Sequence, residues 1–197
     1  MVTAARMFDS PSPPGSRIIL RRALAAGAAF MDGGRDGAFG HEDLHAWIEQ
    51  FLVAPGLMAM PASVQEPGVG TITLEDAPNS AWAASREVRA GRIASTARVR
   101  VAVHLAGLIA SPVDDRFLSA AIFAGRVQRA PGDAGASWRA QPIPEERLSD
   151  IVLSLFAADA LGHREDYARE LCVCEVCGRV RFTKNAVIRA RCAQHQR

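Results

Sequence analysis

Apolar residues recur at helical spacing over much of the chain, and this pattern predicts a mainly helical protein. A first helix is predicted from about Arg17 to Met31, because Ser16 can cap it and Gly33-Gly34 can end it. A second is predicted over 41–53, where one face holds Leu44, Trp47, Ile48, Phe51 and Leu52. The other predicted helices cover 80–90 with an end at Gly91, 111–127, the strongly amphipathic stretch 144–162 and, as a short turn or helix, 164–171.

Two stretches are compatible with strands. A short strand is predicted at 71–75, after a loop over 55–70 that is rich in proline, glycine and methionine. Residues 98–105 alternate between polar and apolar types as a strand does. The same stretch belongs to a stripe that would line one face of a helix, namely Ile93, Ala97, Val101, Leu105 and Leu108. Both interpretations stay open, so the predicted fold class is mainly α with one or more short strands within 71–105. A further loop is predicted over 129–144.

Length and composition suit one helical domain with a small appendage. The chain has 197 residues, of which 49% are hydrophobic, and this is enough to bury a substantial core. We predict a flexible tail over 1–16, where serine and proline are frequent, a helical domain over 17–163, and a metal-binding module over 164–197. The formal net charge of +2 argues against a uniformly basic nucleic-acid-binding protein and against an acidic disordered tail.

The strongest chemical signal is a group of cysteine and histidine residues in the last part of the sequence. Cys174 and Cys177 form a C-x-x-C motif, and Cys192 and His195 form a C-x-x-H motif, with fourteen residues between the two motifs. A tetrahedral zinc ion takes two ligands from each of two tight turns, and two close pairs supply that arrangement. The sequence therefore predicts a closed, structural Zn²⁺ site made by these four side chains.

The segment around these ligands is predicted to form a small β-hairpin. Gly178 allows the backbone to turn back toward the thiolates, and 180–182 and 186–188 suit two short strands. Over about residues 172–197 the chain resembles the zinc-ribbon or treble-clef class of zinc finger. Only two residues follow His195, so we expect a ribbon-like hairpin rather than a treble clef, whose helix would follow that ligand.

Cys172 lies beside this ligand set, and three roles stay open for it. It could be a buried small apolar residue, it could replace Cys174 as a ligand, or it could take part in a redox switch in which oxidation releases zinc. A thiol–zinc redox sensor is accordingly the second alternative function. All four cysteines lie within 172–192 instead of being spread across the fold as in secreted disulfide proteins, which predicts reduced thiols and a cytoplasmic location.

The segment after the C-x-x-C motif is basic. Residues 178–197 hold six basic side chains and no acidic one. The candidate nucleic-acid contacts among them are Arg179, Arg181, Lys184, Arg189 and Arg191. Such charges on a rigid hairpin suit phosphate contacts. They also suit a solvated face that balances the thiolates and the acidic residues nearby, so nucleic acid and a protein partner both stay open.

A second metal-ligand motif lies on the helix predicted over 41–53. His41, Glu42 and His45 match the H-E-x-x-H motif, which places two histidine ligands one helical turn apart beside a general-base glutamate. The main alternative function is therefore a zinc-dependent metallopeptidase with Glu42 as its catalytic residue. Asp43 stands where such proteins usually have an uncharged residue, and no third ligand is evident. The same residues also suit the first turn of an ordinary helix.

Together these features predict a cytoplasmic, mainly helical protein that binds zinc and acts by binding rather than by catalysis. No stretch of the sequence approaches the apolar length of a membrane span, so no membrane partner is expected. The expected partner is either nucleic acid or another protein, and the sequence makes no prediction about the oligomeric state.

Overall fold

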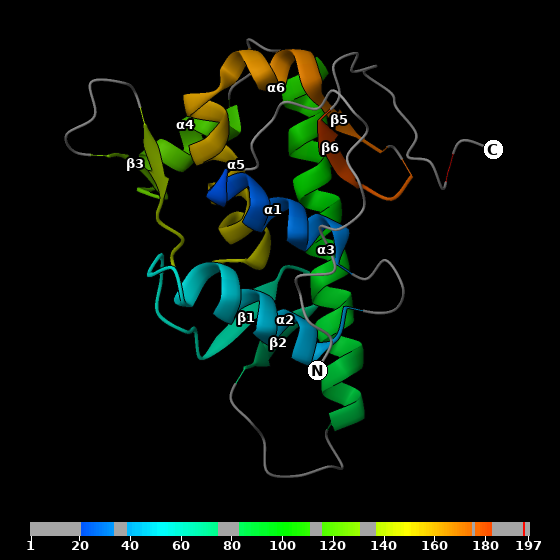
Figure 1. The fold of residues 1–197 in the computed structure, drawn as a ribbon. Helices are drawn as coiled ribbons and strands as arrows, with labels where there is room; N and C mark the ends of the chain where they lie inside the picture. The colour runs from blue at the N-terminus through cyan, green and yellow to red at the C-terminus, as the bar shows by residue number, and fades with distance from the viewer. Residues whose placement is uncertain are drawn as a thin grey trace.

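The computed structural model describes residues 21–33, 39–74, 83–110, 116–130, 137–174, 176–182 and 195. Within these ranges the protein is mainly helical, as predicted, and the strands form antiparallel pairs (Figure 1). The elements in chain order are α1 (Arg22–Asp32), α2 (His41–Ile48), the π-helical turn η2 (Glu49–Val53), β1 (Ser63–Glu66), β2 (Gly70–Thr73), α3 (Ala83–Ala110), α4 (Arg116–Phe123), β3 (Val127–Arg129), β4 (Trp138–Ala140), α5 (Leu148–Gly162), α6 (Arg164–Glu170), β5 (Leu171–Val173) and β6 (Val180–Phe182).

α5 is the central helix of the fold, in contact with α1, α3, α4 and β4. The prediction of a strongly amphipathic helix here is wrong, because nearly every position of α5 is buried, polar positions included. Ser154 is tolerated inside because its hydroxyl donates a hydrogen bond to the carbonyl of Ile151 at 2.6 Å. The helix begins at Leu148 rather than at the predicted residue 144. In its first turn, the buried carboxylate of Glu66 accepts a hydrogen bond from the backbone N–H of Ser149 at 2.6 Å.

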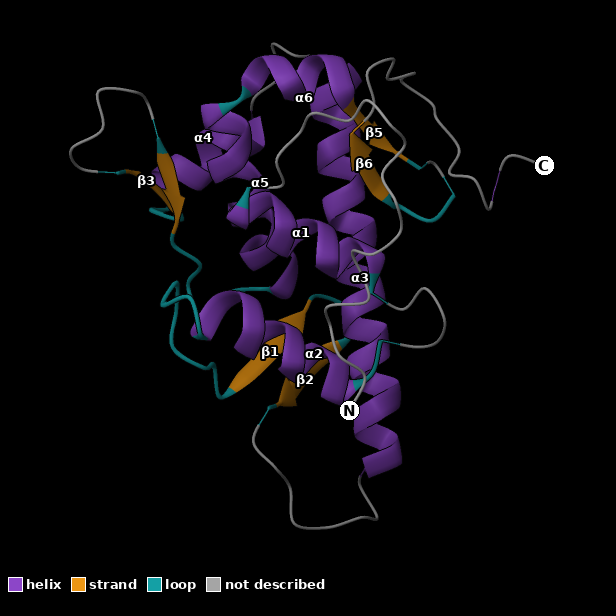
Figure 2. Ribbon diagram, in the orientation of Figure 1, coloured by secondary structure: helices purple, strands orange, loops and turns teal. Residues whose placement is uncertain are grey.

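α3 is one continuous helix of 28 residues, about 42 Å long. The helix continues through Gly91, so the predicted helix end at that residue is wrong. It also continues through 98–105, which confirms the helical interpretation of that stretch and rules out the strand. Figure 2 shows that α3 spans much of the molecule, with the β1–β2 and β5–β6 pairs beside different parts of it. The helix persists because it buries a continuous apolar stripe, Ala90, Ile93, Ala94, Ala97, Val101 and Leu105, against its neighbours.

The prediction that no stretch approaches the apolar length of a membrane span is wrong for α3, because among the described helices this one is long and apolar enough to cross a membrane. The core helix of a folded domain has the same properties, and 39% of the most apolar part of α3 is buried within the protein. The composition of this one helix is therefore a weak basis for assigning it to a membrane.

α1 and α2 are both close to their predicted positions. α1 begins at Arg22, later than the predicted start near Arg17, because Arg21 has an extended backbone with φ −72° and ψ 150°. The helix predicted over 41–53 is confirmed as α2 followed by η2. The indole N–H of Trp47 donates to the carbonyl of Ala26 at 3.0 Å, which joins α2 to α1.

The β1–β2 hairpin lies partly in a stretch predicted to be a loop. β2 confirms the strand predicted near 71–75, but its partner β1 was predicted as part of the loop over 55–70. β1 is stable as a strand because Val64 and Glu66 are buried on one face of the pair. Two glycines with positive φ, Gly68 at 82° and Gly70 at 107°, form the turn.

The β3–β4 hairpin also lies mostly in a predicted loop, the one over 129–144. α4 ends at Phe123, whereas the sequence predicts a helix that continues to about Val127. Gly125 accounts for the earlier end, since its φ of 71° takes the chain out of the helix and into β3.

Candidate metal centre

The C-x-x-C motif lies in the turn between β5 and β6. β6 confirms the strand predicted at 180–182, but its partner within the described part of the chain is β5, which precedes Cys174. The register pairs Leu171 with Phe182 and Val173 with Val180. The other predicted strand, 186–188, lies outside the described residues. Two strands that flank the motif therefore hold its two cysteines at the tip of a hairpin.

The backbone of the turn places both thiols on the same side. The Cys174 N–H donates to the carbonyl of Arg179 at 2.8 Å, and the Gly178 N–H donates to the carbonyl of Cys174 at 2.8 Å. Gly178 has φ 68°, as the sequence predicts for a residue that turns the chain back. A Cβ atom at this position would lie 3.1 Å from the Cβ of Ala102, so the turn sits directly against α3.

Three potential ligands converge at this turn. The ligand atoms of Cys174, Cys177 and His195 all lie within 4.8 Å of one another, and the Cys174 Sγ to His195 Nδ1 distance is 3.6 Å. In a tetrahedral zinc site, a metal–sulfur bond of about 2.3 Å and a metal–nitrogen bond of about 2.0–2.1 Å separate the two ligand atoms by about 3.6 Å. The spacing therefore fits a metal ion bound between these side chains, and thiolates with imidazole are donors that suit zinc. Cys192 lies outside the described residues.

The two cysteines differ in exposure. Cys174 is buried, with 4% of its surface exposed, whereas Cys177 is exposed at the outer side of the turn. Cys172, two residues before Cys174, is buried on β5 opposite Arg181 and is not in the group of three converging ligands. Burial of Cys172 agrees with the role of a small apolar residue.

The hairpin is attached to the helical body by apolar and charged contacts. Leu171, Val173 and Val180 belong to the hydrophobic core of the body. The Tyr167 ring of α6 packs edge-to-face on Phe182, with 5.2 Å between ring centroids. Helix and hairpin thus share one core, while the predicted division of the chain at residue 164 stays a prediction.

The basic residues proposed to contact nucleic acid divide into two groups. Arg179 is largely buried, and its Nε lies 3.0 Å from the Asp32 carboxylate at the end of α1, so it holds the hairpin to the body. Arg181 is half-buried on β6. The other three, Lys184, Arg189 and Arg191, lie outside the described residues.

The H-E-x-x-H motif has a different environment. The Nε2 atom of His41 lies 3.1 Å from the carbonyl oxygen of Thr73 and 2.6 Å from Nη2 of Arg86, so a hydrogen bond with one of these two groups occupies it and a cation adjoins it. His45 is half-buried and Glu42 is exposed. Neither histidine belongs to a group of three potential ligands within the described residues. This geometry gives the metallopeptidase alternative no support.

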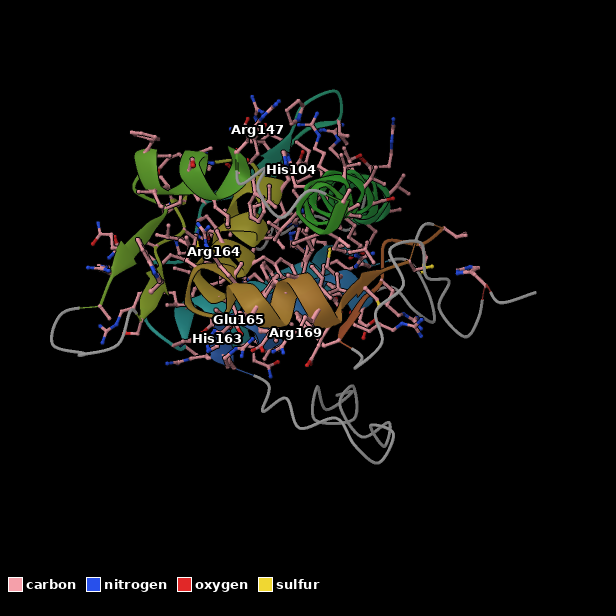
Figure 3. The ribbon with its side chains drawn as sticks, turned by 90° about the horizontal axis from the view of Figure 1, so that it is seen from above. His104, Arg147, His163, Arg164, Glu165 and Arg169 are labelled. Carbon is pink, nitrogen blue, oxygen red and sulfur yellow. The ribbon has the colours of Figure 1, made fainter. Side chains whose placement is uncertain are left out.

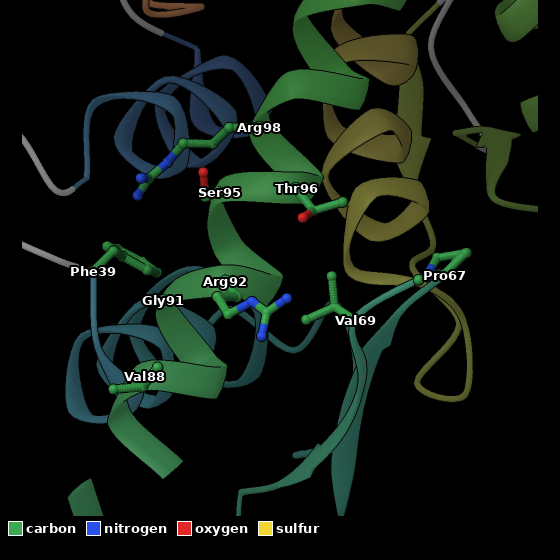
Figure 4. A pocket seen from close by; sticks show the side chains of 10 residues that line it. Phe39, Pro67, Val69, Val88, Gly91, Arg92, Ser95, Thr96 and Arg98 are labelled. Carbon is green, nitrogen blue, oxygen red and sulfur yellow. The ribbon is translucent and has the colours of Figure 1, made fainter. Parts of the chain in front are cut away.

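A groove over the middle of α3 has a volume of about 730 Å³ (Figure 4). The half-buried Arg98 in its lining donates from Nε to the carbonyl of Phe30 at 2.8 Å, and its guanidinium lies 4.7 Å from the ring centroid of Phe39. Burial lowers the pKa of Arg98 to about 10, and the Asp32 and Asp43 carboxylates oppose that shift. Arg98 therefore joins α1 to α3. The lining includes Arg92, Ser95 and Thr96 but no histidine or carboxylate that would act as a general base.

One ionic cluster was not predicted from the sequence. Arg21 donates to both carboxylate oxygens of Asp159, at 2.7 and 2.9 Å, and to Asp166 at 3.1 Å. Burial raises the pKa of Tyr167 well above its usual value, and the neighbouring Asp159 carboxylate raises it further. The signal available in the sequence was Asp159 itself, a carboxylate within the apolar run of α5.

No protein-family model, curated protein or solved structure matches this chain. The resemblance to the zinc-ribbon or treble-clef class accordingly stays an expectation.

Proposed function

We propose that the chain is a zinc-binding protein without enzymatic activity, in which the metal fastens the C-terminal segment onto the helical body. The observation that carries this proposal is the convergence of Cys174, Cys177 and His195 on a hairpin that packs against α3. In this proposal Cys192 supplies the fourth ligand. A site with four protein ligands leaves no coordination position for a reacting water, as is typical of structural zinc.

Replacement of zinc by Co²⁺ in the full chain tests the ligand set, because the cobalt absorption spectrum depends on its ligands. A tetrahedral site with thiolates gives strong visible bands and a thiolate-to-cobalt charge-transfer band. Cys177→Ser and Cys192→Ser should each weaken the charge-transfer band by about one third, since three thiolates are proposed. The His41→Ala and His45→Ala variants serve as controls and should leave the spectrum unchanged. Weak bands typical of octahedral oxygen ligands would contradict the proposed centre.

We further propose that the C-terminal segment contacts the partner, through Arg181, Lys184, Arg189 and Arg191. Arg179 is left out because its side chain pairs with Asp32. For nucleic acid, neutralised phosphates release counterions, so binding should weaken steeply with salt.

Fluorescence anisotropy with labelled duplex DNA and single-stranded RNA, measured over a range of salt concentrations, distinguishes the two kinds of partner. Changing Lys184, Arg189 and Arg191 together to glutamine should reduce the slope of log K against log salt by about 2.7 if all three contact duplex phosphates. The exposed Arg92→Gln variant on α3 is the matched control. Absence of binding to both nucleic acids would leave a protein as the proposed partner.

The exposure of Cys177 favours a second candidate, the thiol–zinc redox sensor, in a cytoplasmic location where thiols stay reduced. Hydrogen peroxide would oxidise the Cys177 thiolate to a sulfenic acid and be reduced to water. A second thiolate, either Cys172 as in the hypothesis drawn from the sequence or Cys174, would then displace hydroxide to form a disulfide. Zinc release by peroxide, reversed by a thiol reductant, is the expected result. Zinc retention at peroxide concentrations that modify the exposed thiol of an unfolded control would contradict this candidate.

A further inference from the structure

A cavity whose lining includes none of the three converging metal ligands has the composition of a small-molecule site. It lies where the start of α1, the turn at 55–57, β4 and the end of α5 come together, and its volume is about 950 Å³. Small-molecule sites typically occupy about 300–1,000 Å³. The charged side chains, the indole and the imidazole of its lining belong to Arg21, Arg22, Trp138, Arg139, Asp159 and His163.

The innermost part of this cavity is a fixed ionic cluster. The Asp159 side chain is 2% exposed, and the bidentate pair with Arg21 satisfies both of its carboxylate oxygens. Asp166 holds the remaining side of the Arg21 guanidinium at 3.1 Å. A buried ion pair adds little net stability compared with apolar packing. The cluster therefore gives this part of the cavity a polar surface whose position is fixed by its hydrogen bonds.

His163 presents one ring nitrogen to a ligand. It lies at the junction of α5 and α6, at the start of α6 in Figure 3, and its side chain is 40% exposed. Its Nδ1 lies 3.0 Å from the main-chain carbonyl oxygen of Asp159, which can only accept a hydrogen bond. Nδ1 therefore donates to this carbonyl, and Nε2 is the ring nitrogen that this hydrogen bond leaves for a polar group of a ligand.

The mouth of the cavity is positively charged and includes an aromatic ring. Arg22 and Arg139 are exposed, and neither forms an ion pair with any residue of the described ranges. With Arg21, the lining holds three guanidinium groups, and these face the two carboxylates of Asp159 and Asp166, so one positive charge remains. Trp138 on β4 is half-buried, with the guanidinium of Arg129 6.0 Å from its ring centroid.

We propose that this cavity binds a small molecule in which a flat ring is joined to a phosphate, with a nucleoside monophosphate as the simplest example. The ring packs against Trp138, and the phosphate is bound by Arg22 and Arg139. A hydroxyl of the ligand forms a hydrogen bond with Nε2 of His163. The site is separate from the metal centre, and its occupancy does not depend on the identity of the metal.

Isothermal titration calorimetry of the full chain with AMP, adenosine and inorganic phosphate tests this proposal. AMP should bind with a dissociation constant below about 1 mM and at least about tenfold more tightly than either fragment, because both halves of the ligand contribute. Arg139→Ala and Trp138→Leu should each weaken AMP binding about tenfold or more. Arg92→Ala removes an equally exposed arginine from α3 and should leave the affinity unchanged.

Three outcomes would overturn the proposal. These are the absence of binding by all three probes at about 1 mM, equal affinity for AMP and one of its fragments, and unchanged AMP affinity in the Arg139→Ala variant. Circular dichroism checks that each variant is folded. Because Arg139 is exposed, its variant decides the outcome even if the half-buried Trp138 cannot be replaced without unfolding.

Discussion

Two regions of this protein carry metal-ligand spacing in the sequence, and the structure treats them differently. In the β5–β6 turn, the ligand atoms of Cys174, Cys177 and His195 approach within 4.8 Å of one another. On α2, His41 and His45 are also one helical turn apart, but Nε2 of His41 already contacts the carbonyl of Thr73 and the guanidinium of Arg86.

The difference shows what a spacing motif does and does not determine. Spacing places ligands on one side of a turn or helix, which is a local property of the chain. Whether their lone pairs remain available depends on neighbours from other elements, here β2 and the first turns of α3. The comparison therefore predicts a metal at the hairpin and none at α2.

The largest expected effect is on the free energy of unfolding when the hairpin site is lost. In Cys174→Ser, zinc no longer stabilises the folded state. At a free zinc concentration 1,000 times the dissociation constant, that contribution is about 4 kcal/mol. Denaturant unfolding of the wild type and the variant, with and without a chelator, measures it. Equal stability of the two proteins in excess zinc would show that this residue is not a ligand.

A smaller effect is expected from Gly178→Ala. The substitution forces an L-residue into φ 68° and brings its Cβ to 3.1 Å from that of Ala102. The backbone cost is about 1–2 kcal/mol, and zinc affinity should fall because the strained turn presents the two thiols. Competition with a chromophoric chelator measures the affinity. Gly56→Ala, at a positive-φ glycine with open space around it, is the control for backbone strain alone, and its zinc affinity should equal that of the wild type.

His41→Ala should change stability by about 1 kcal/mol without changing the metal content. The loss comes from the hydrogen bond that Nε2 of the buried ring makes with one of its two neighbours, Thr73 or Arg86. Thermal unfolding combined with metal analysis checks both parts. A stoichiometric loss of zinc in this variant would reverse the comparison and favour the site on α2.

The smallest expected effect is spectroscopic and follows from the buried Tyr167, the one tyrosine of the sequence. Its pKa is raised by burial and by Asp159, so tyrosinate should not form near pH 10 while the protein is folded. Above pH 10 the unfolded chain loses this proton and the folded one keeps it, so stability should fall as pH rises from there.

Ultraviolet absorbance of tyrosinate reports this group alone. In Cys174→Ser, a loosened hairpin would uncover the Tyr167 ring beside Phe182, and ionisation should move toward pH 10. Half-ionisation near pH 10 in the folded, zinc-bound wild type would contradict the burial of this ring.

The candidate metal ligands could be predicted from the sequence because the C-x-x-C turn is a local structure. The pairing of β6 with β5 could not, since the sequence offered a second strand after the turn and gave no sign of the contact with α3. Likewise, the apolar run of α5 was evident, but the sequence could not show that Asp159 is buried. Its partner Arg21 lies 138 residues away along the chain.

The prediction that a helix ends at Gly91 is wrong for a related reason, because contacts with other elements outweigh local preference. Glycine weakens a helix by about 1 kcal/mol relative to alanine. The stripe that runs through Ile93, Ala97 and Val101 buries enough apolar surface against neighbouring elements to outweigh that cost. Local propensity decided the ends of short elements such as α4, and packing decided the length of α3.

Elemental analysis of zinc tests the central claim most directly, when it is applied to the full chain, to Cys174→Ser and to the His41→Ala/His45→Ala double variant. We predict one zinc per chain in the wild type, none in Cys174→Ser, and one in the double histidine variant. Zinc that survives Cys174→Ser but is lost from the double histidine variant would contradict this account and place the metal on α2.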